Sequence, residues 1–111
     1  MDREAVIEKV MKYSQLVFTV LKPNKIILFG SYAKGNWTEN SDIDVAIFVD
    51  KMQDDFLQLS TKLCKLTRTI DYRIEPILLE EDNDPSGFVS DIKKQGISIF
   101  QKESKTHYTT L

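Results

Sequence analysis

The sequence is poor in the features that mark secreted, membrane-spanning or nucleic-acid-binding proteins. It has one cysteine in 111 residues, Cys64, which cannot form an internal disulfide, so we expect a reduced, cytoplasmic protein. No apolar run approaches the ~18 residues that a membrane span needs, and the first residues do not begin a signal peptide. Neither charge dominates, because 15 Lys plus Arg against 17 Asp plus Glu give −2. Nucleic acid is therefore not the expected partner.

What remains is an ordinary globular composition, with 41% hydrophobic and 29% charged residues. A chain of this length supports one domain, which buries roughly 60–70% of its extended surface. We predict that this domain covers residues 1–100 and that residues 101–111 form a polar tail. His107 in that tail is not expected to be catalytic. We therefore expect no separate lobe that would hold an acceptor substrate.

The periodicity of apolar residues predicts alternating helices and strands. The predicted helices cover residues 4–21, 54–67 and 86–95, the last closed by Gly96. The predicted strands cover residues 25–29, 42–49, 69–79 and 97–100, with a solvated acidic turn over 80–85. Phe88 is expected in the core, and Trp37 is expected to cover the sheet edge. This order predicts an α/β or α+β domain, a single sheet with helices packed on it.

Gly30 and Ser31 follow directly after a predicted buried strand. A glycine lets the backbone approach a ligand closely, and the free N–H groups at a helix start favour a phosphate. The Ser31 hydroxyl can donate to a phosphate oxygen, and Lys34 is near enough to add positive charge. Taken alone, the same pair is more often a plain turn with a helix cap.

Two groups of acidic residues lie on predicted strands. Asp42 and Asp44 are two apart, so they share a strand face with Cα atoms roughly 7 Å apart, where Mg²⁺ can neutralise them. Asp71, Arg73 and Glu75 share a face of the predicted third strand, and one of these carboxylates completes a cluster if the two strands are neighbours. Each group has a simpler alternative. Asp42 and Asp44 are then solvated carboxylates, and the third strand has an ordinary polar face on which Arg73 pairs with an acid.

Together, Gly30-Ser31, ten intervening residues and Asp42-x-Asp44 form a specific pattern. The pattern resembles the signature of the DNA polymerase β-like nucleotidyltransferase superfamily, and residues 28–35 and 41–47 resemble its minimal nucleotidyltransferase (MNT) branch. The resemblance spans about residues 25–100 and implies an α/β (α+β) fold, a single mixed sheet flanked by helices.

The resemblance also implies roles for individual residues. Asp42 and Asp44 would hold two Mg²⁺ ions, and Gly30 and Ser31, with Lys34, would hold the triphosphate of the nucleotide. The third catalytic and metal-binding carboxylate is assigned to Glu75, where the family usually has Asp, with Asp71 as the alternative.

The implied reaction is Mg²⁺-dependent transfer of AMP from ATP to a hydroxyl. MNT proteins often act as antitoxins that adenylylate a tyrosine of a HEPN-type toxin, so a partner protein is the expected acceptor. The alternative is a catalytically degenerate binding module that masks its partner. Transfer to a small molecule or an RNA end is a third reading, which the absence of an acceptor-binding domain disfavours.

Overall fold

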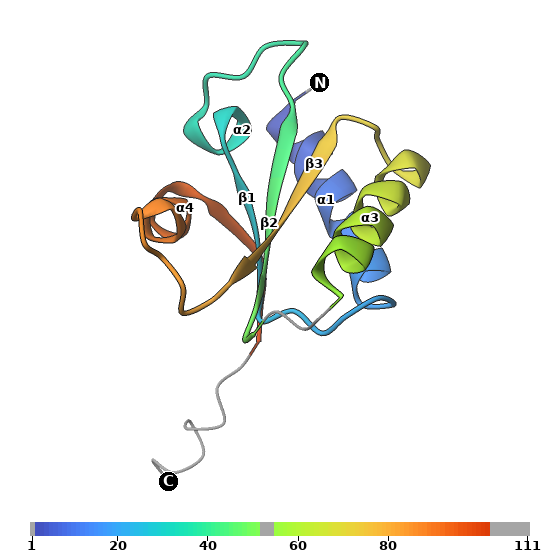
Figure 1. Ribbon diagram of the computed structural model, residues 1–111. Helices are drawn as coiled ribbons and strands as arrows, with labels where there is room; N and C mark the ends of the chain where they lie inside the picture. The colour runs from blue at the N-terminus through green and yellow to red at the C-terminus, as the bar shows by residue number, and fades with distance from the viewer. Residues whose placement is uncertain (1, 52–54, 103–111) are drawn as a thin grey trace, which may run out of the picture.

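Four strands form one sheet in the order β3–β2–β1–β4, flanked by helices (Figure 1). The computed structural model describes residues 2–51 and 55–102. Its helices are α1 (Arg3–Val17), α2 (Ser31–Lys34), α3 (Phe56–Leu66), the 3₁₀ turn η1 (Thr67–Thr69) and α4 (Phe88–Gln95). Its strands are β1 (Lys25–Phe29), β2 (Ile43–Val49), β3 (Ile74–Glu80) and β4 (Ile97–Gln101).

The sheet is mixed, which confirms the predicted fold class. β1 pairs antiparallel with β2 and with β4, whereas β2 and β3 are parallel. The apolar centre of β1 is buried, as expected for a strand covered on both faces. Pro76 lies in β3 at the edge of the sheet, where a residue without an N–H donor is tolerated.

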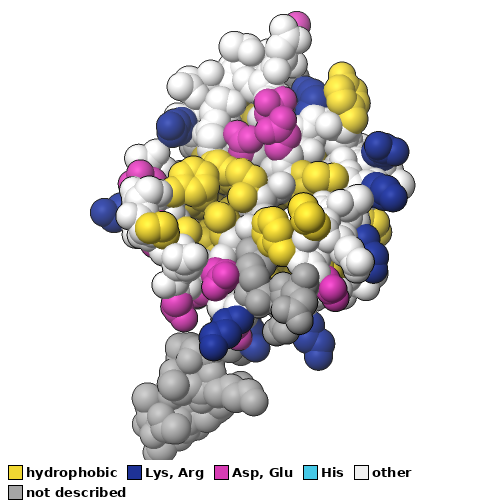
Figure 2. Space-filling view, in the orientation of Figure 1, with side chains coloured by type: hydrophobic (Ala, Val, Ile, Leu, Met, Phe, Trp, Pro, Cys, Tyr) yellow, Lys and Arg dark blue, Asp and Glu magenta, His cyan; other side chains and the backbone are white. Residues whose placement is uncertain are grey.

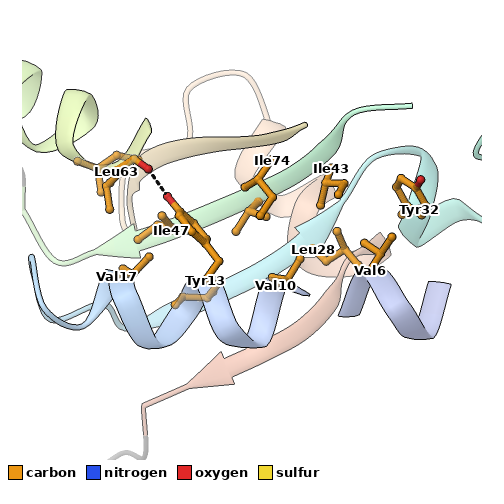
Figure 3. Packing of buried hydrophobic residues seen from close by; sticks show 13 residues of the cluster. Val6, Val10, Tyr13, Val17, Leu28, Tyr32, Ile43, Ile47, Leu63 and Ile74 are labelled. Carbon is orange, nitrogen blue, oxygen red and sulfur yellow. Dashed lines mark hydrogen bonds between the residues drawn. The ribbon is translucent and has the colours of Figure 1, made fainter. Parts of the chain in front are cut away.

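Helices α1 and α3 cover one face of the sheet and enclose most of the core. Four side chains of α1 are buried against alternate residues of the central strands (Figure 3); they are Val6, Val10, Tyr13 and Val17. Their spacing of three or four residues places them on one side of the helix. The Tyr13 hydroxyl donates a 2.7 Å hydrogen bond to the Leu63 carbonyl and so joins α1 to α3.

The opposite face of the sheet is covered by α4, which buries Val89 and Ile92 against β1 and β2. Gly96 ends α4 as predicted, but it does so in an extended conformation. Glycine is needed because a Cβ at this position would collide with the Ile27 side chain and the Ile92 carbonyl. Phe88 was predicted to be in the core, but it is 43% exposed at the start of α4, so that prediction was wrong.

Two predicted elements differ from the observed ones by more than a helix-end or strand-end residue or two. α1 ends at Val17 rather than at residue 21, because the chain then turns with the Thr19 amide bonded to the Leu16 carbonyl. β3 begins at Ile74 rather than at residue 69, because η1 and a turn occupy the preceding residues. Asp71 and Arg73 therefore precede the strand, and the predicted face shared with Glu75 does not exist.

The acidic turn over residues 80–85 is predicted to be solvated, but two of its acids instead make contacts within the protein. The Glu81 carboxylate bonds to Lys25 at 3.0 Å and to Lys93 at 2.6 Å. The Asp84 carboxylate accepts hydrogen bonds from the backbone N–H groups of Val89 and Ser90 and thereby caps α4. These acids fix α4 to the sheet.

No helix within residues 2–51 and 55–102 is both long and apolar enough to cross a membrane. Residues 103–111, including His107, lie outside the described residues. The proposed boundary between the domain and its tail at residue 100 therefore stays a prediction.

Candidate active site

The parallel pairing of β2 with β3 brings Asp44 and Glu75 together. The two residues are direct partners across the two strands, so their side chains lie on the same face of the sheet. Asp42 precedes β2 by one residue, two positions from Asp44. This is the face of the sheet that α4 covers in part. In Figure 2 a group of acidic side chains lies on the surface next to a hydrophobic patch. The sheet thus collects three carboxylates at one end.

Two of the three carboxylates, those of Asp44 and Glu75, have raised pKa values. Burial and the nearby charge of Asp42 raise the pKa of Asp44. Partial desolvation, the charges of Asp42 and Asp44, and a hydrogen bond with Asp42 raise the pKa of Glu75, although its side chain is largely exposed. Each effect disfavours a further negative charge, which is the behaviour of a group that binds a cation or a proton.

The turn after β1 closes on the same carboxylates. Phe29, the last residue of β1, is the sheet partner of Asp44. Gly30 has φ 75° and ψ −151°, a conformation that is essentially restricted to glycine. A Cβ on Gly30 would collide with the Asp44 carboxylate. Ser31 follows as the first residue of α2, and Lys34 ends this helix with its side chain exposed.

Arg3, which no sequence pattern singles out, supports this turn. Its guanidinium donates to the Tyr32 carbonyl at 2.9 Å and to the Ala33 carbonyl at 3.3 Å, at the end of α2. It also lies over Trp37, which stacks on Tyr32 with ring centroids 5.4 Å apart. Trp37 is therefore a packing residue, and its predicted place over the sheet edge stays a prediction. Arg3 is 29 residues from Tyr32 in the sequence, and no local pattern links the two.

Asp71, the alternative third carboxylate, is bound elsewhere. One of its oxygens lies 2.8 Å from Lys9 Nζ and 2.8 Å from Arg73 Nη2, and its side chain is 6% exposed. Hydrogen bonds from Arg73, and then from Lys9, hold the pKa of Asp71 well below its usual range against the opposing effect of burial. Arg73 thus pairs with an acid, but the pair precedes β3 and does not lie on the polar strand face that this interpretation assumed.

The three carboxylates at positions 42, 44 and 75 fit a divalent cation by their chemistry. Hard cations prefer carboxylate oxygens. A bound cation would offset the desolvation and the mutual repulsion that raise two of these pKa values. In the part of the chain that the structure describes, no group of three His, Cys, Asp or Glu side chains is already arranged to hold a metal. The fit therefore rests on donor type and proximity.

Comparison with known proteins identifies the family. The model of the family described as "Polymerase beta, Nucleotidyltransferase" matches residues 6–105. The chain belongs to the polymerase β nucleotidyltransferase family. This nucleotidyltransferase is also 31% identical over 100 residues to "Putative protein adenylyltransferase MJ0141" of Methanocaldococcus jannaschii, across 85% of this chain and 98% of that protein. The resemblance that Gly30-Ser31 and Asp42-x-Asp44 suggested is confirmed.

Solved structures share the fold of this nucleotidyltransferase. A toxin–antitoxin crystal structure with AMP-PNP matches with a TM-score of 0.64 and 23% identity, over 92% of this chain and 78% of that chain. A structure of tri-AMPylated Shewanella oneidensis HEPN toxin in complex with MNT antitoxin matches with a TM-score of 0.59 and 20% identity, over 96% and 78%. At these identities the likeness shows a common fold.

Proposed function

We propose that this nucleotidyltransferase transfers AMP from ATP to a hydroxyl group of a partner protein in the cytoplasm, as the MNT antitoxin of a HEPN/MNT pair. The observation that carries the proposal is the gathering of Asp42, Asp44 and Glu75 beside the Gly30 turn. The names of the M. jannaschii relative and of the HEPN–MNT complex support a protein acceptor.

In this proposal, the chain positions the two reactants for an in-line displacement. The acceptor oxygen forms a bond to the α-phosphorus while the bond from that phosphorus to pyrophosphate breaks. Two Mg²⁺ ions held by Asp42, Asp44 and Glu75 would neutralise phosphate charge and lower the pKa of the acceptor hydroxyl. The Glu75 carboxylate would accept the proton of that hydroxyl.

The turn at Gly30 would hold the leaving pyrophosphate. The first N–H groups of a helix have no partner within that helix, and the Ser31 hydroxyl adds a donor beside them. Lys34 adds a positive charge at the other end of the same short helix. Because Gly30 also abuts Asp44, the nucleotide phosphates and the carboxylates would occupy adjoining positions. Placement and neutralisation of charge would then supply most of the rate.

A labelling experiment tests this function. The protein is incubated with Mg²⁺, ATP labelled on the α-phosphate and the HEPN-type product of a neighbouring gene. We expect label on a tyrosine of that partner, and a loss of roughly 100-fold or more in the Asp42→Asn/Asp44→Asn variant. Asp82→Asn, which changes an exposed acid in the turn after β3, serves as the matched control. Equal labelling by the double variant would refute the proposal.

A second candidate is a module that masks its partner without catalysis. It is favoured by the absence, among the described residues, of a preformed group of three metal ligands, and by Glu75 in the place of an aspartate. Titration calorimetry separates the two functions. Binding of the partner with no heat from Mg²⁺-ATP favours the masking module, whereas heat from Mg²⁺-ATP that is lost in the double variant favours the enzyme.

A further inference from the structure

A cavity of about 340 Å³ opens between α2 and α4 next to the Gly30 turn. Its apolar wall is formed by Phe29, Phe88 and Ile92. Gly30, whose Cα adjoins the Asp44 carboxylate, also lines it. The rings of Phe29 and Phe88 meet edge to face, with centroids 6.0 Å apart at 84°. Phe88 remains 43% exposed, so a large aromatic surface faces an open cavity. Such a cavity has the size and lining of a small-molecule site.

The polar residues of this cavity lie around its rim. They are Lys34 at the end of α2 and Asp91 and Gln95 on α4, all of them exposed. Gln95 carries both a hydrogen-bond donor and an acceptor on one amide. An apolar aromatic wall with a donor–acceptor pair at its edge matches a nucleobase, which has an aromatic face and a polar edge.

We infer that this cavity binds the base of the nucleotide substrate, with Phe88 packing on the ring and Gln95 selecting adenine. The inference rests on the proposed function, which places the phosphates at Gly30. Since Gly30 lines the cavity and also abuts Asp44, one nucleotide can reach from the carboxylates into the cavity. Phe29, the sheet partner of Asp44, adds a second link between the two places.

The selection of adenine over guanine follows from the pattern of donors and acceptors. A glutamine amide pairs with adenine by accepting from N6 and donating to N7. Guanine has acceptors at both O6 and N7, so the carbonyl of Gln95 would face an acceptor and lose one hydrogen bond. A good pair of this kind changes the affinity ratio of the two bases about tenfold.

Binding of the four Mg²⁺-nucleoside triphosphates, measured by calorimetry without any partner protein, tests the inference. We expect the wild type to bind ATP about tenfold more tightly than GTP. Phe88→Ala should lower the affinity for ATP about tenfold, because an aromatic ring that stacks on a base contributes about this much to binding. Phe88→Trp should retain the affinity, and Gln95→Leu should remove the preference for ATP.

Two matched controls come from exposed residues far from the cavity. Phe18→Ala removes a ring that is 44% exposed and packs edge to face on Phe100, much as Phe88 packs on Phe29. Gln58→Leu changes an exposed glutamine of α3. Both controls should bind all four nucleotides like the wild type, and circular dichroism should report folded protein for every variant.

Each outcome decides the question. ATP affinity that is weakened by Asp42→Asn/Asp44→Asn but unchanged in Phe88→Ala and Gln95→Leu overturns the base site and leaves the proposed function intact. An equal loss of ATP affinity in Phe18→Ala and Phe88→Ala also overturns the base site, because removal of any exposed ring would then have the same effect. No nucleotide binding by the wild type overturns both proposals together.

Discussion

The carboxylate of Asp44 occupies the space in which the β-carbon of any other residue at position 30 would lie. Gly30 is thus required twice, once by its backbone angles and once by its neighbour. The turn and the carboxylate cluster are built as one unit, since the glycine that aims the backbone also leaves room for the acid.

Replacing Gly30 by alanine should therefore damage the site as well as the fold. The strained backbone alone should cost about 1–3 kcal/mol of unfolding free energy. The displaced Asp44 carboxylate should additionally abolish binding of Mg²⁺-ATP. Urea denaturation and calorimetry measure the two effects separately.

Gly87 provides the matched control, because it also has a positive φ of 80° but has no atom within 4 Å of an added Cβ. Gly87→Ala should cost about 1–2 kcal/mol of stability and leave nucleotide binding unchanged. An equal loss of binding in both variants would show that strain, and not contact with Asp44, explains the effect of Gly30→Ala.

The crowded carboxylates should make Glu75→Gln slightly more stable than the wild type at neutral pH. The pKa of Glu75 is raised, so its charge destabilises the folded state above that raised pKa, and this cost is absent below the ordinary value of 4.5. We expect a gain of less than about 1 kcal/mol at pH 7.5, because the side chain is exposed, and none at pH 4. Urea denaturation at both pH values measures it. A gain that persists unchanged at pH 4 would contradict the electrostatic cause.

Mg²⁺ should raise the melting temperature of the wild type, because a ligand that binds only the folded state stabilises it. At ten times the dissociation constant the gain is about 1.4 kcal/mol, or several degrees for a domain of this size. The shift should disappear with a chelator and in Asp42→Asn/Asp44→Asn, and should persist in Asp82→Asn. Equal shifts in all three proteins would mean that Mg²⁺ acts elsewhere.

Asp71→Asn should affect stability rather than catalysis. Asp71 is nearly buried and bonded to Lys9 and Arg73, so we expect a loss of about 2 kcal/mol at pH 7. Its lowered pKa means that its contribution is present above the ordinary value of 3.8 and is lost as the pH falls through the lower folded value. The difference between wild type and variant, measured by urea denaturation, should therefore shrink below pH 4. The rate of nucleotide transfer per folded molecule should stay the same. A loss of transfer without a matching loss of stability would mean that Asp71 takes part in the active site.

The parts of the site that sequence alone predicted are those within one local segment. Gly30 and Ser31 follow a short apolar strand, and Asp42 and Asp44 open another, so their positions depend on neighbours in the chain. The pairing of Asp44 with Glu75 depends on strand order, which no local pattern contains. The sequence predicts this pairing only if the second and third strands are neighbours in the sheet.

The predicted start of the third strand failed because a local turn outcompeted the apolar alternation. The Asp71 carboxylate accepts from the Arg73 backbone N–H at 2.9 Å, a side-chain-to-backbone bond that favours a turn over a strand. Similarly, Phe88 has the spacing of a core residue, but only the tertiary structure shows that it stays 43% exposed. Arg3 acts across 29 residues and left no local signal.

Two buried tyrosines offer a final test of which polar contacts hold the domain together. The Tyr13 hydroxyl donates to the Leu63 carbonyl at 2.7 Å, and burial raises the pKa of Tyr13, so the donor keeps its proton. The Tyr32 hydroxyl is also buried, but it has no hydrogen-bond partner among the residues that the structure describes. Removing a satisfied donor leaves its acceptor unpaired, whereas removing an unsatisfied one relieves a desolvation cost.

Tyr13→Phe should thus lower the unfolding free energy by about 1–2 kcal/mol, and Tyr32→Phe should leave it unchanged or raise it by up to about 1 kcal/mol. Each substitution deletes the same single oxygen from a fully packed ring, so the pair controls for the change in volume. Urea denaturation at one pH compares them directly. A loss in Tyr32→Phe as large as that in Tyr13→Phe would mean that the Tyr32 hydroxyl has a partner in solution, because only a satisfied hydroxyl can contribute such stability.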